Sequence, residues 1–446
     1  MKQILEKAKR IVIPSTRLQQ DKVEIANLAL KLVKEQSSRY QQIVGVEFGG
    51  SYSKGTWLSD RADIDVFIKF EKSVNEEKFV ELARKIGFSS LKRFNPYVRY
   101  SDHPYVEAKV HETKVNVVPC YDVEKGQWKS AADRSPFHTR FMLESLTSTM
   151  KDEARLLKVF LRTIGIYGAE IAKQGFSGYV VEVLIWNYGT FENVIKTFAD
   201  LKPNQIIGNA SKEFDTTLVI MDPIDNTRNL AAAISIENIG EFVLACRSFL
   251  QKPTISFFKP RVSSKVSKKN LENTLVVTFS FRPRSPDVIW GQIKRATNSL
   301  ATQMQIEKFN VLRKSAVTDE KTKAALLFLL QSTEIDTLYI REGPSFYSKM
   351  DSTMFMTKNM EKSKVMWVNM DGRIFSLQKR NQNYARLFLQ NLLKNHLDKA
   401  GIPKGLRPDL KKGFKILPAN KMTSKFIKET LTELVTTNNA IFSFTR

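Results

Sequence analysis

One stretch near the N-terminus, residues 48–70, limits what this chain can fold into more than any other. In the segment ADIDVFIKF, the apolar Ile64 and Val66 alternate with Asp63 and Asp65, which is the pattern of a strand with one buried face. The two aspartates then project together from the opposite face. Adjacent carboxylates repel each other unless a divalent cation neutralises them, and hard oxygen ligands suit Mg²⁺. This strand therefore predicts a magnesium site.

A glycine-rich turn lies just before this strand. Gly49, Gly50 and Ser51 follow the predicted strand QQIVGVEF and open a short helix in SYSKGTWLSD. In such a turn, backbone N–H groups and a hydroxyl can hold a phosphate, with help from the helix dipole. An isolated Asp-x-Asp pair is more often a solvated strand edge, and a Gly-Gly-Ser turn is usually only a turn. Because both occur here on adjacent strands, together they predict a site for a nucleoside triphosphate and its metal.

The residues around this motif predict a small mixed sheet with helices. Residues 23–33 and 76–88 have the spacing of amphipathic helices. Residues 105–123 alternate in polarity and predict a hairpin, with its polar turn at Glu112 and Thr113. We expect this first domain to span residues 1–145.

The rest of the chain predicts two further domains, one mostly helical at 146–252 and one α+β at 253–446. In the helical domain, the Gly-rich GFSGYVVEVLIWNYG interrupts the helices, and the polar, basic segment 253–270 marks the boundary. The last domain alternates strands with helices and divides into two subparts. Its predicted strands are 273–281, 336–343 and 364–378, and its predicted helices are 286–304, 321–331 and 384–400.

Composition excludes several classes of protein. The 446 residues are 42% hydrophobic, which is ordinary for folded domains. No run of about 18 apolar residues and no signal-peptide pattern occurs, so we expect a cytoplasmic protein. The chain has only two cysteines and four scattered histidines, which argues against a structural metal site and a disulfide framework.

The basic charge is concentrated in the last domain. The net charge is +24; residues 1–145 hold 25 basic and 19 acidic side chains, residues 146–252 hold 11 and 12, and residues 253–446 hold 34 and 15. A folded basic surface of this size favours a polyanion such as nucleic acid as partner. The alternative is that the lysines serve solubility.

The motifs resemble a known family. The stretch FGGSYSKGTWLSDRADIDVFIKF is similar to the signature of the polymerase-beta-like nucleotidyltransferases, and in detail to the archaeal (class I) CCA-adding enzymes. The likeness continues through HPYVEAKV, VNVVPCY, SPFHTRFM, RLLKVFLRTIGIYGAE, GFSGYVVEVLI and MDPIDNTRNLAAAIS, and covers most of the chain in order. It implies an α+β multidomain protein with a nucleotidyltransferase palm, a helical central domain that completes the nucleotide pocket, and an α+β body and tail.

The resemblance implies that the protein adds C, C and A to the 3′ end of tRNA from CTP and ATP, without a nucleic-acid template. Asp63 and Asp65 would hold two Mg²⁺ ions, and Gly50 and Ser51 would grip the triphosphate. Two alternatives stay open: an RNA-binding protein with a degenerate nucleotidyltransferase site, and an oligoadenylate or poly(A) polymerase of the same superfamily.

Residues of the central domain also match family positions. By the resemblance, Lys158 and Tyr167 contact the triphosphate, His138 (and His103 in the palm) belong to the nucleotide site, and Arg228 reads the base edge together with phosphates of the tRNA. Asp222 and Asp225, which precede Arg228, either orient that loop or cap the next helix.

The tRNA would bind to the basic domain through its acceptor stem and T arm, largely by backbone and shape. The protein could also form a homodimer, and the sequence leaves this oligomeric state open. The densest basic stretch supplies the predicted phosphate contacts, for which a solvated helix face is the alternative: Lys404, Arg407, Lys411, Lys412, Lys415, Lys421, Lys425 and Lys428.

The chain departs from the family at one catalytic position. The family carries a third carboxylate in a stretch of the form VDVVPCY, and this chain has Asn116 there. The amide is neutral, offers one oxygen and is not a base, so the metal that activates the 3′-hydroxyl should bind more weakly. Three explanations compete: an engineered change, a natural variant with an impaired site, or compensation by a nearby carboxylate. In sequence, Glu112 and Asp122 are the nearest candidates.

Overall fold

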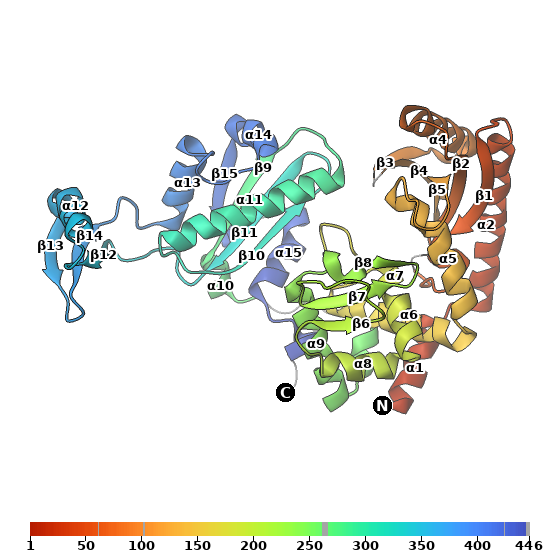
Figure 1. The fold of residues 1–446 in the computed structure, drawn as a ribbon, viewed down its shortest axis with the longest axis horizontal. Helices are drawn as coiled ribbons and strands as arrows, with labels where there is room; N and C mark the ends of the chain where they lie inside the picture. The colour runs from red at the N-terminus through yellow and green to blue at the C-terminus, as the bar shows by residue number, and fades with distance from the viewer. Residues whose placement is uncertain (61, 101–102, 261–265, 423, 443–446) are drawn as a thin grey trace. The chain divides into compact units, whose positions relative to one another are not determined.

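The computed structural model describes residues 1–60, 62–100, 103–260, 266–422 and 424–442. They form two compact units, one from residues 1–262 with the C-terminal 438–446, and one from residues 263–437 (Figure 1). The two units separate within the predicted boundary segment 253–270. Each unit has its own sheets and core, so each is described by itself.

The first unit begins with a five-stranded mixed sheet in the strand order β1-β2-β5-β4-β3. Strands β2 and β5 are parallel, and the other pairs are antiparallel. Ile64 and Val66 of β2 pack with Ala26 and Phe79 of the covering helices α2 and α4. The opposite face of β2, which carries Asp65, is therefore left for the site. The elements are α1 (Lys2–Val12), α2 (Thr16–Ser37), β1 (Ile43–Gly49), α3 (Gly50–Lys54), β2 (Ile64–Glu71), α4 (Glu76–Ser90), β3 (Tyr97–Tyr100), β4 (Pro104–Val110), β5 (Thr113–Asp122) and α5 (Arg134–Ser145).

The second part of this unit is built from helices around a phenylalanine-rich core, with a small three-stranded sheet. The Gly-rich segment that we expected to interrupt the helices is itself a helix, α7, because the Ser177 side chain caps its first turn by accepting from the N–H of Val180. The elements are α6 (Ser148–Ile164), α7 (Gly178–Tyr188), α8 (Phe191–Ala199), β6 (Gln205–Ile207), β7 (Leu218–Asp222), β8 (Asp225–Asn229), α9 (Ile236–Gln251) and, near the C-terminus, α16 (Asn439–Phe442).

The second unit contains a four-stranded antiparallel sheet in the order β10-β11-β9-β15, covered on one face by α11 and α13 and on the other by α15. A smaller three-stranded sheet, β12-β14-β13, packs against α12 (Figure 1). The elements are α10 (Lys268–Glu272), β9 (Thr274–Ser280), α11 (Pro286–Ile306), β10 (Val311–Thr318), β11 (Lys323–Leu330), β12 (Leu338–Ser345), α12 (Lys349–Asn359), β13 (Ser363–Val368), β14 (Arg373–Lys379), α13 (Ala385–Asn395), α14 (Arg407–Lys412), β15 (Phe414–Pro418) and α15 (Lys425–Val435).

One predicted helix of this unit is wrong. Residues 321–331 were expected to be helical, but they contain strand β11, which pairs with β10 on one side and β9 on the other. The run AALLFLL is buried on both faces of the sheet, so it shows no alternation of polar and apolar residues. A continuous apolar run of this length cannot be assigned to helix or strand by periodicity alone.

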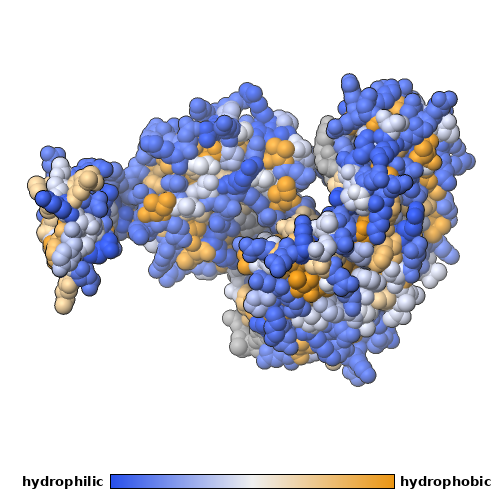
Figure 2. Space-filling view, viewed as in Figure 1, coloured by the Kyte–Doolittle hydropathy of each residue, from blue (hydrophilic) through white to orange (hydrophobic). Residues whose placement is uncertain are grey.

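Within the part of the chain that the structure describes, no helix is both long enough and apolar enough to cross a membrane. On the face shown in Figure 2, hydrophilic side chains cover most of both units.

Candidate active site

The structure brings Asp65 and Asn116 into direct contact on the face of the first sheet opposite α2 and α4. The two residues are paired in the register of the parallel strands β2 and β5, and Nδ2 of Asn116 donates to Oδ1 of Asp65 at 2.8 Å. Asp63 lies just before β2 and its charge acts on Asp65. The predicted catalytic trio therefore lies at one end of two adjacent strands.

The electrostatics of this group fit a cation. Burial raises the pKa of Asp65, a hydrogen bond from Asn116 opposes that rise, and the negative charge of Asp63 adds to it. Oδ1 of Asn116 is buried, and no described residue donates a hydrogen bond to it. In the described ranges, no three His, Cys, Asp or Glu side chains are grouped closely enough for one metal ion, so the donor set is two carboxylates and one amide oxygen. Such oxygen ligands suit Mg²⁺.

The glycine-rich turn lies against the same carboxylate. Gly50 begins α3 with a φ of +66°, and a Cβ atom at this position would lie 1.8 Å from Oδ2 of Asp65. Only glycine fits both the left-handed backbone and the lack of space. Ser51 follows on α3, so the turn and the aspartate strand lie directly against each other.

Lys158 lies in a buried charge cluster that sequence reasoning missed in part. The fully buried carboxylate of Glu182 accepts from Lys54 and Thr56, and from Nζ of Lys158 at 2.8 Å. Lys158 also donates to Oγ1 of Thr56 at 2.9 Å. Burial would raise the pKa of Glu182, but the charges of Lys158 and Lys54 lower it to about 2. Two buried ammonium groups against one carboxylate leave this cluster with a net positive charge, which favours an anion nearby.

Tyr167 and Lys158 meet at the first residue of α7. A Cβ atom on Gly178 would lie 3.1 Å from the hydroxyl of Tyr167 and 3.6 Å from Nζ of Lys158. The two residues that the family resemblance assigns to the triphosphate are therefore neighbours, although Lys158 is almost fully buried and ion-paired to Glu182.

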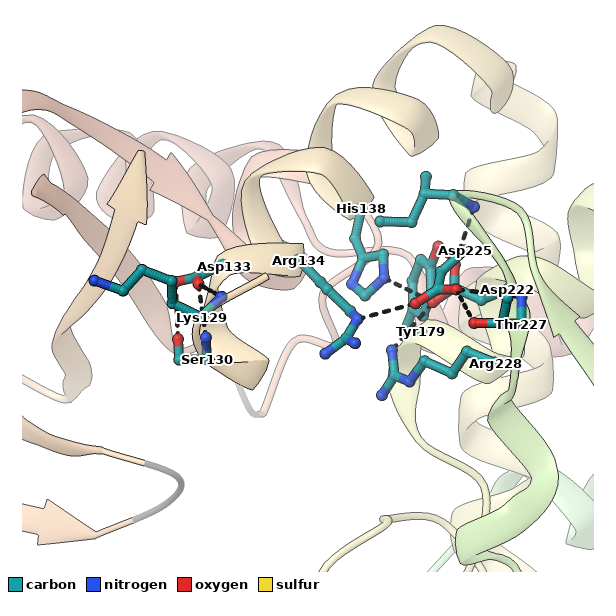
Figure 3. A network of polar contacts seen from close by, with 11 residues as sticks. Lys129, Ser130, Asp133, Arg134, His138, Tyr179, Asp222, Asp225, Thr227 and Arg228 are labelled. Atoms are coloured by element: carbon teal, nitrogen blue, oxygen red, sulfur yellow. Dashed lines mark hydrogen bonds and ion pairs between the residues drawn. The ribbon is translucent and has the colours of Figure 1, made fainter. Parts of the chain in front are cut away.

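The carboxylate of Asp222 holds Arg228 in place. It lies at the end of β7, is 2% exposed, and accepts from Arg228 at 3.1 Å, from the hydroxyl of Tyr179 at 3.0 Å and from the backbone N–H of Ile224 at 3.1 Å. His138 contributes a fourth contact, with Nε2 at 3.0 Å from Oδ2 (Figure 3). Asp222 therefore orients the Arg228 loop, which was one of the two roles that its position suggested.

His138 is held between Asp222 and an aromatic ring. Its imidazole stacks on Tyr179 with ring centroids 3.8 Å apart. Burial lowers the pKa of His138, partly offset by the hydrogen bond and charge of Asp222. The same buried environment, together with Asp222, raises the pKa of Tyr179. A neutral imidazole whose Nε2–H donates to the carboxylate satisfies both groups.

Asp225 has a local role. It accepts from the N–H and hydroxyl of Thr227, and Nε of Arg134 lies 3.4 Å away (Figure 3). The expectation that one of the two aspartates caps the next helix is wrong, because Asn229 and Ser235 cap the following helical segments.

In the second unit, the predicted phosphate-binding residues are exposed except one. Lys411 and Lys415 line a cavity of about 510 Å³, together with Arg386 and Lys394 of the α13 region. Arg407 is half-buried and ion-paired to Asp398, so its guanidinium is already used inside the unit. The remaining lysines of the set lie on exposed positions between residues 404 and 428.

The missed residues had different signals. Glu182 is the one charged residue within the apolar run GYVVEVLIW, and a carboxylate in such a run must be paired when the helix is buried. Tyr179 and Thr56 had no signal in the sequence, because their roles depend on contacts between distant segments.

Comparison with known proteins decides the family. Three family models match successive parts of the chain: "Nucleotidyltransferase domain" over residues 30–144, "tRNA nucleotidyltransferase, second domain" over 152–259, and "CCA-adding enzyme, C-terminal domain" over 272–419. The CCA-adding enzyme of Sulfurisphaera tokodaii is 36% identical over 352 residues, which are 78% of this chain and 83% of that protein. This chain belongs to the CCA-adding enzymes.

A second CCA-adding enzyme, from Sulfolobus acidocaldarius, is 35% identical over 368 residues, which are 81% of this chain and 86% of that protein. The solved structure of the Cid1 poly(U) polymerase has 13% identity and a TM-score of 0.45, over 58% of this chain and 98% of that chain. The predicted fold class and the predicted identity as a CCA tRNA nucleotidyltransferase are confirmed. The alternative of a degenerate RNA-binding protein is not favoured.

Proposed function

We propose that this CCA-adding enzyme adds C, C and A to the 3′ end of tRNA from CTP and ATP, with its catalytic centre at Asp63, Asp65 and Asn116. The observation that carries the proposal is the contact of the Gly50 turn with Asp65, beside Asn116 on the neighbouring strand. It joins a phosphate-binding turn to a pair of carboxylates, which nucleotidyl transfer requires.

In this proposal, Asp63 and Asp65 hold Mg²⁺, and the oxygen of Asn116 completes the set. When bound, Mg²⁺ would stabilise negative charge on the phosphates and favour ionisation of the attacking hydroxyl. The backbone at Gly50 and the hydroxyl of Ser51 position the triphosphate. Lys158 and Tyr167, which lie next to the first residue of α7, supply a positive charge and a hydroxyl to it.

Base selection is assigned to Arg228. Its planar guanidinium is fixed by Asp222 and is partly exposed, so the remaining N–H groups can donate to acceptors on a pyrimidine or an adenine. His138, stacked on Tyr179, belongs to the same group of side chains. We assign these residues to one nucleotide pocket, and the tRNA contributes the rest of the selectivity.

The tRNA is assigned to the basic second unit, where it is held by its acceptor stem and T arm. Lys411 and Lys415, together with Arg386 and Lys394, surround a cavity of about 510 Å³ that a phosphate backbone can enter. We assign the enzyme to the cytoplasm. A homodimer stays a prediction, which light scattering would test.

The decisive experiment is incubation of the protein with tRNA that lacks its CCA end and with separately labelled CTP, ATP and UTP. Ordered incorporation of C, C and A that then stops is the expected result. An open-ended A tail would instead indicate a poly(A) polymerase. Intact tRNA binding without incorporation would indicate an RNA-binding protein that has lost its chemistry.

A further inference from the structure

The two carboxylates nearest to Asn116 in sequence cannot replace the missing third carboxylate. Asp122 lies at the other end of β5 and Glu112 lies in the turn before it. At about 3.3 Å per residue, six and four residues along an extended chain separate them from Asn116 by roughly 20 and 13 Å. Glu112 is 90% exposed and pairs with Lys109, while Asp122 lies 3.8 Å from Lys69.

A third carboxylate lies directly across the sheet instead. Glu107 of β4 is the register partner of Asn116 of β5, just as Asp65 is its partner on the opposite side. Residues paired across strands share a face of the sheet. Asp65, Asn116 and Glu107 therefore form a row on the face that carries the site, and the Glu107 residue is only 3% exposed.

We propose that Glu107 supplies the carboxylate that position 116 lacks, as a catalytic residue that binds the metal next to the RNA 3′-hydroxyl. This inference rests on the proposed function of the site. In this proposal the site keeps a full set of metal ligands, although its third carboxylate comes from β4 and position 116 carries an amide.

The lengths of the side chains allow this. Cβ atoms of directly opposed residues in antiparallel strands lie about 5 Å apart. Glutamate is one methylene longer than aspartate, so a carboxylate on the next strand can turn toward the space above position 116. In the described structure the carboxylate of Glu107 is not grouped with Asp63 and Asp65; it accepts from the hydroxyl of Tyr97 on β3 and lies 3.7 Å from Nζ of Lys114 on β5. Metal binding therefore requires a change of its side-chain rotamer.

Besides the hydroxyl of Tyr97, two cations hold Glu107, and Glu107 must exchange these contacts before it can bind a metal. Nε of Arg99 lies 3.6 Å and Nζ of Lys114 lies 3.7 Å from its carboxylate oxygens, and these cations are 38% and 49% exposed. Because both cations are partly exposed, RNA phosphates can replace Glu107 as their partner.

The charges of the row support the assignment. The negative charge of Glu107 already contributes to raising the pKa of Asp65. An aspartate at position 116 would lie between Asp65 and Glu107, with three carboxylates on consecutive strands. The amide avoids this repulsion and donates to Asp65. With Asn116 and Glu107, the site holds as many carboxylates as it would with an aspartate at position 116 and no carboxylate at position 107.

The test uses four full-length proteins: the unchanged chain, Glu107→Gln, Asn116→Asp and the double variant. Two quantities are measured: the single-turnover rate of CMP transfer to tRNA lacking CCA, and Mn²⁺ binding by electron paramagnetic resonance with a non-hydrolysable CTP analogue. Glu112→Gln, a neighbouring carboxylate outside the row, is the matched control and should match the unchanged chain.

Glu107→Gln should lower the transfer rate about 100-fold or more and weaken binding of one Mn²⁺ ion, as expected for loss of a charged ligand. The double variant should transfer CMP at least about tenfold faster than Glu107→Gln. The single change Asn116→Asp should alter the transfer rate by less than this, because the two positions are coupled. A Glu107→Gln protein with unchanged rate and Mn²⁺ binding, or a loss that Asn116→Asp fails to recover, would overturn the proposal.

Two further readouts keep these outcomes separable. If Glu107→Gln does not fold, Glu107→Asp keeps the charge but shortens the reach, and the same rescue by Asn116→Asp is expected. If the unchanged chain transfers no nucleotide at all, the proposed function fails, whereas the Mn²⁺ measurement still tests whether Glu107 is a ligand.

Discussion

The backbone of Gly50 lies so close to Asp65 that a single added carbon would displace the carboxylate. Gly50→Ala should therefore reduce CMP transfer by about 100-fold or more, because the new Cβ meets Oδ2 and the left-handed backbone is strained by about 1–2 kcal/mol. Single-turnover transfer and urea unfolding measure the two effects. Gly240→Ala on α9, where nothing lies within 4 Å, is the control and should leave transfer unchanged.

Glu182→Gln should destabilise the protein by about 3–5 kcal/mol, because Lys54 and Lys158 would be left buried without a counter-charge. Urea unfolding measures the change. The control is Glu192→Gln on α8, which removes a partly exposed pair with Lys196 and should cost below about 0.5 kcal/mol. Equal losses of unfolding free energy in the two variants would contradict the conclusion that Glu182 neutralises buried lysines.

The same carboxylate predicts a dependence on pH. The pKa of Glu182 is about 2 in the folded chain, against an ordinary value of 4.5. A lowered pKa contributes stability that is fully present above pH 4.5 and is lost as the pH falls toward 2. The difference in unfolding free energy between the unchanged protein and Glu182→Gln should therefore be constant from pH 5 to 7 and shrink below about 4.5.

Asp222→Asn should reduce the discrimination between CTP and UTP by about tenfold, since Arg228 loses a charge-assisted hydrogen bond of about 1.5 kcal/mol. The ratio of kcat/KM for the two nucleotides is the measurement. Asp200→Asn, at the exposed end of α8, is the matched control. An Asp222→Asn protein that discriminates as well as the unchanged enzyme would show that Arg228 does not depend on this carboxylate.

Lys411→Gln and Lys415→Gln should weaken tRNA binding and make it less sensitive to salt. Each phosphate contact that is lost should lower the slope of log K against log salt by about 0.7–0.9. Filter binding at several salt concentrations measures this slope. Lys31→Gln on the exposed face of α2 should leave this slope unchanged. An equal effect of all three substitutions would mean that the cavity lined by Lys411 and Lys415 is not a specific RNA site.

The sequence was sufficient for elements whose pattern is local. Alternation predicted β2 and β5, and the Gly49-Gly50-Ser51 turn predicted the short helix that begins at Gly50. Strand β11 was missed because both of its faces are buried, which removes the alternation on which a prediction depends. Contacts between distant segments, such as those of Tyr179 with His138 and Asp222, leave no local pattern.

The site residues follow the same rule. Asp63 and Asp65 could be grouped from their strand pattern, and Asn116 joined them through the resemblance of its strand to the family. Glu107 could not, since its place opposite Asn116 depends on the register of β4 against β5, and a shift of one residue would turn it to the other face. Register is set by the packing of the whole sheet.

The Lys54–Glu182–Lys158 cluster has a consequence for anyone who builds hybrid enzymes. Lys54 and Thr56 come from the nucleotidyltransferase region, while Lys158 and Glu182 come from the helical region. A chimaera that joins this N-terminal region to a foreign helical region without a matching acid would bring cations together with no counter-charge. We therefore expect a hybrid enzyme to fold well only when the acid and its cations are transferred together.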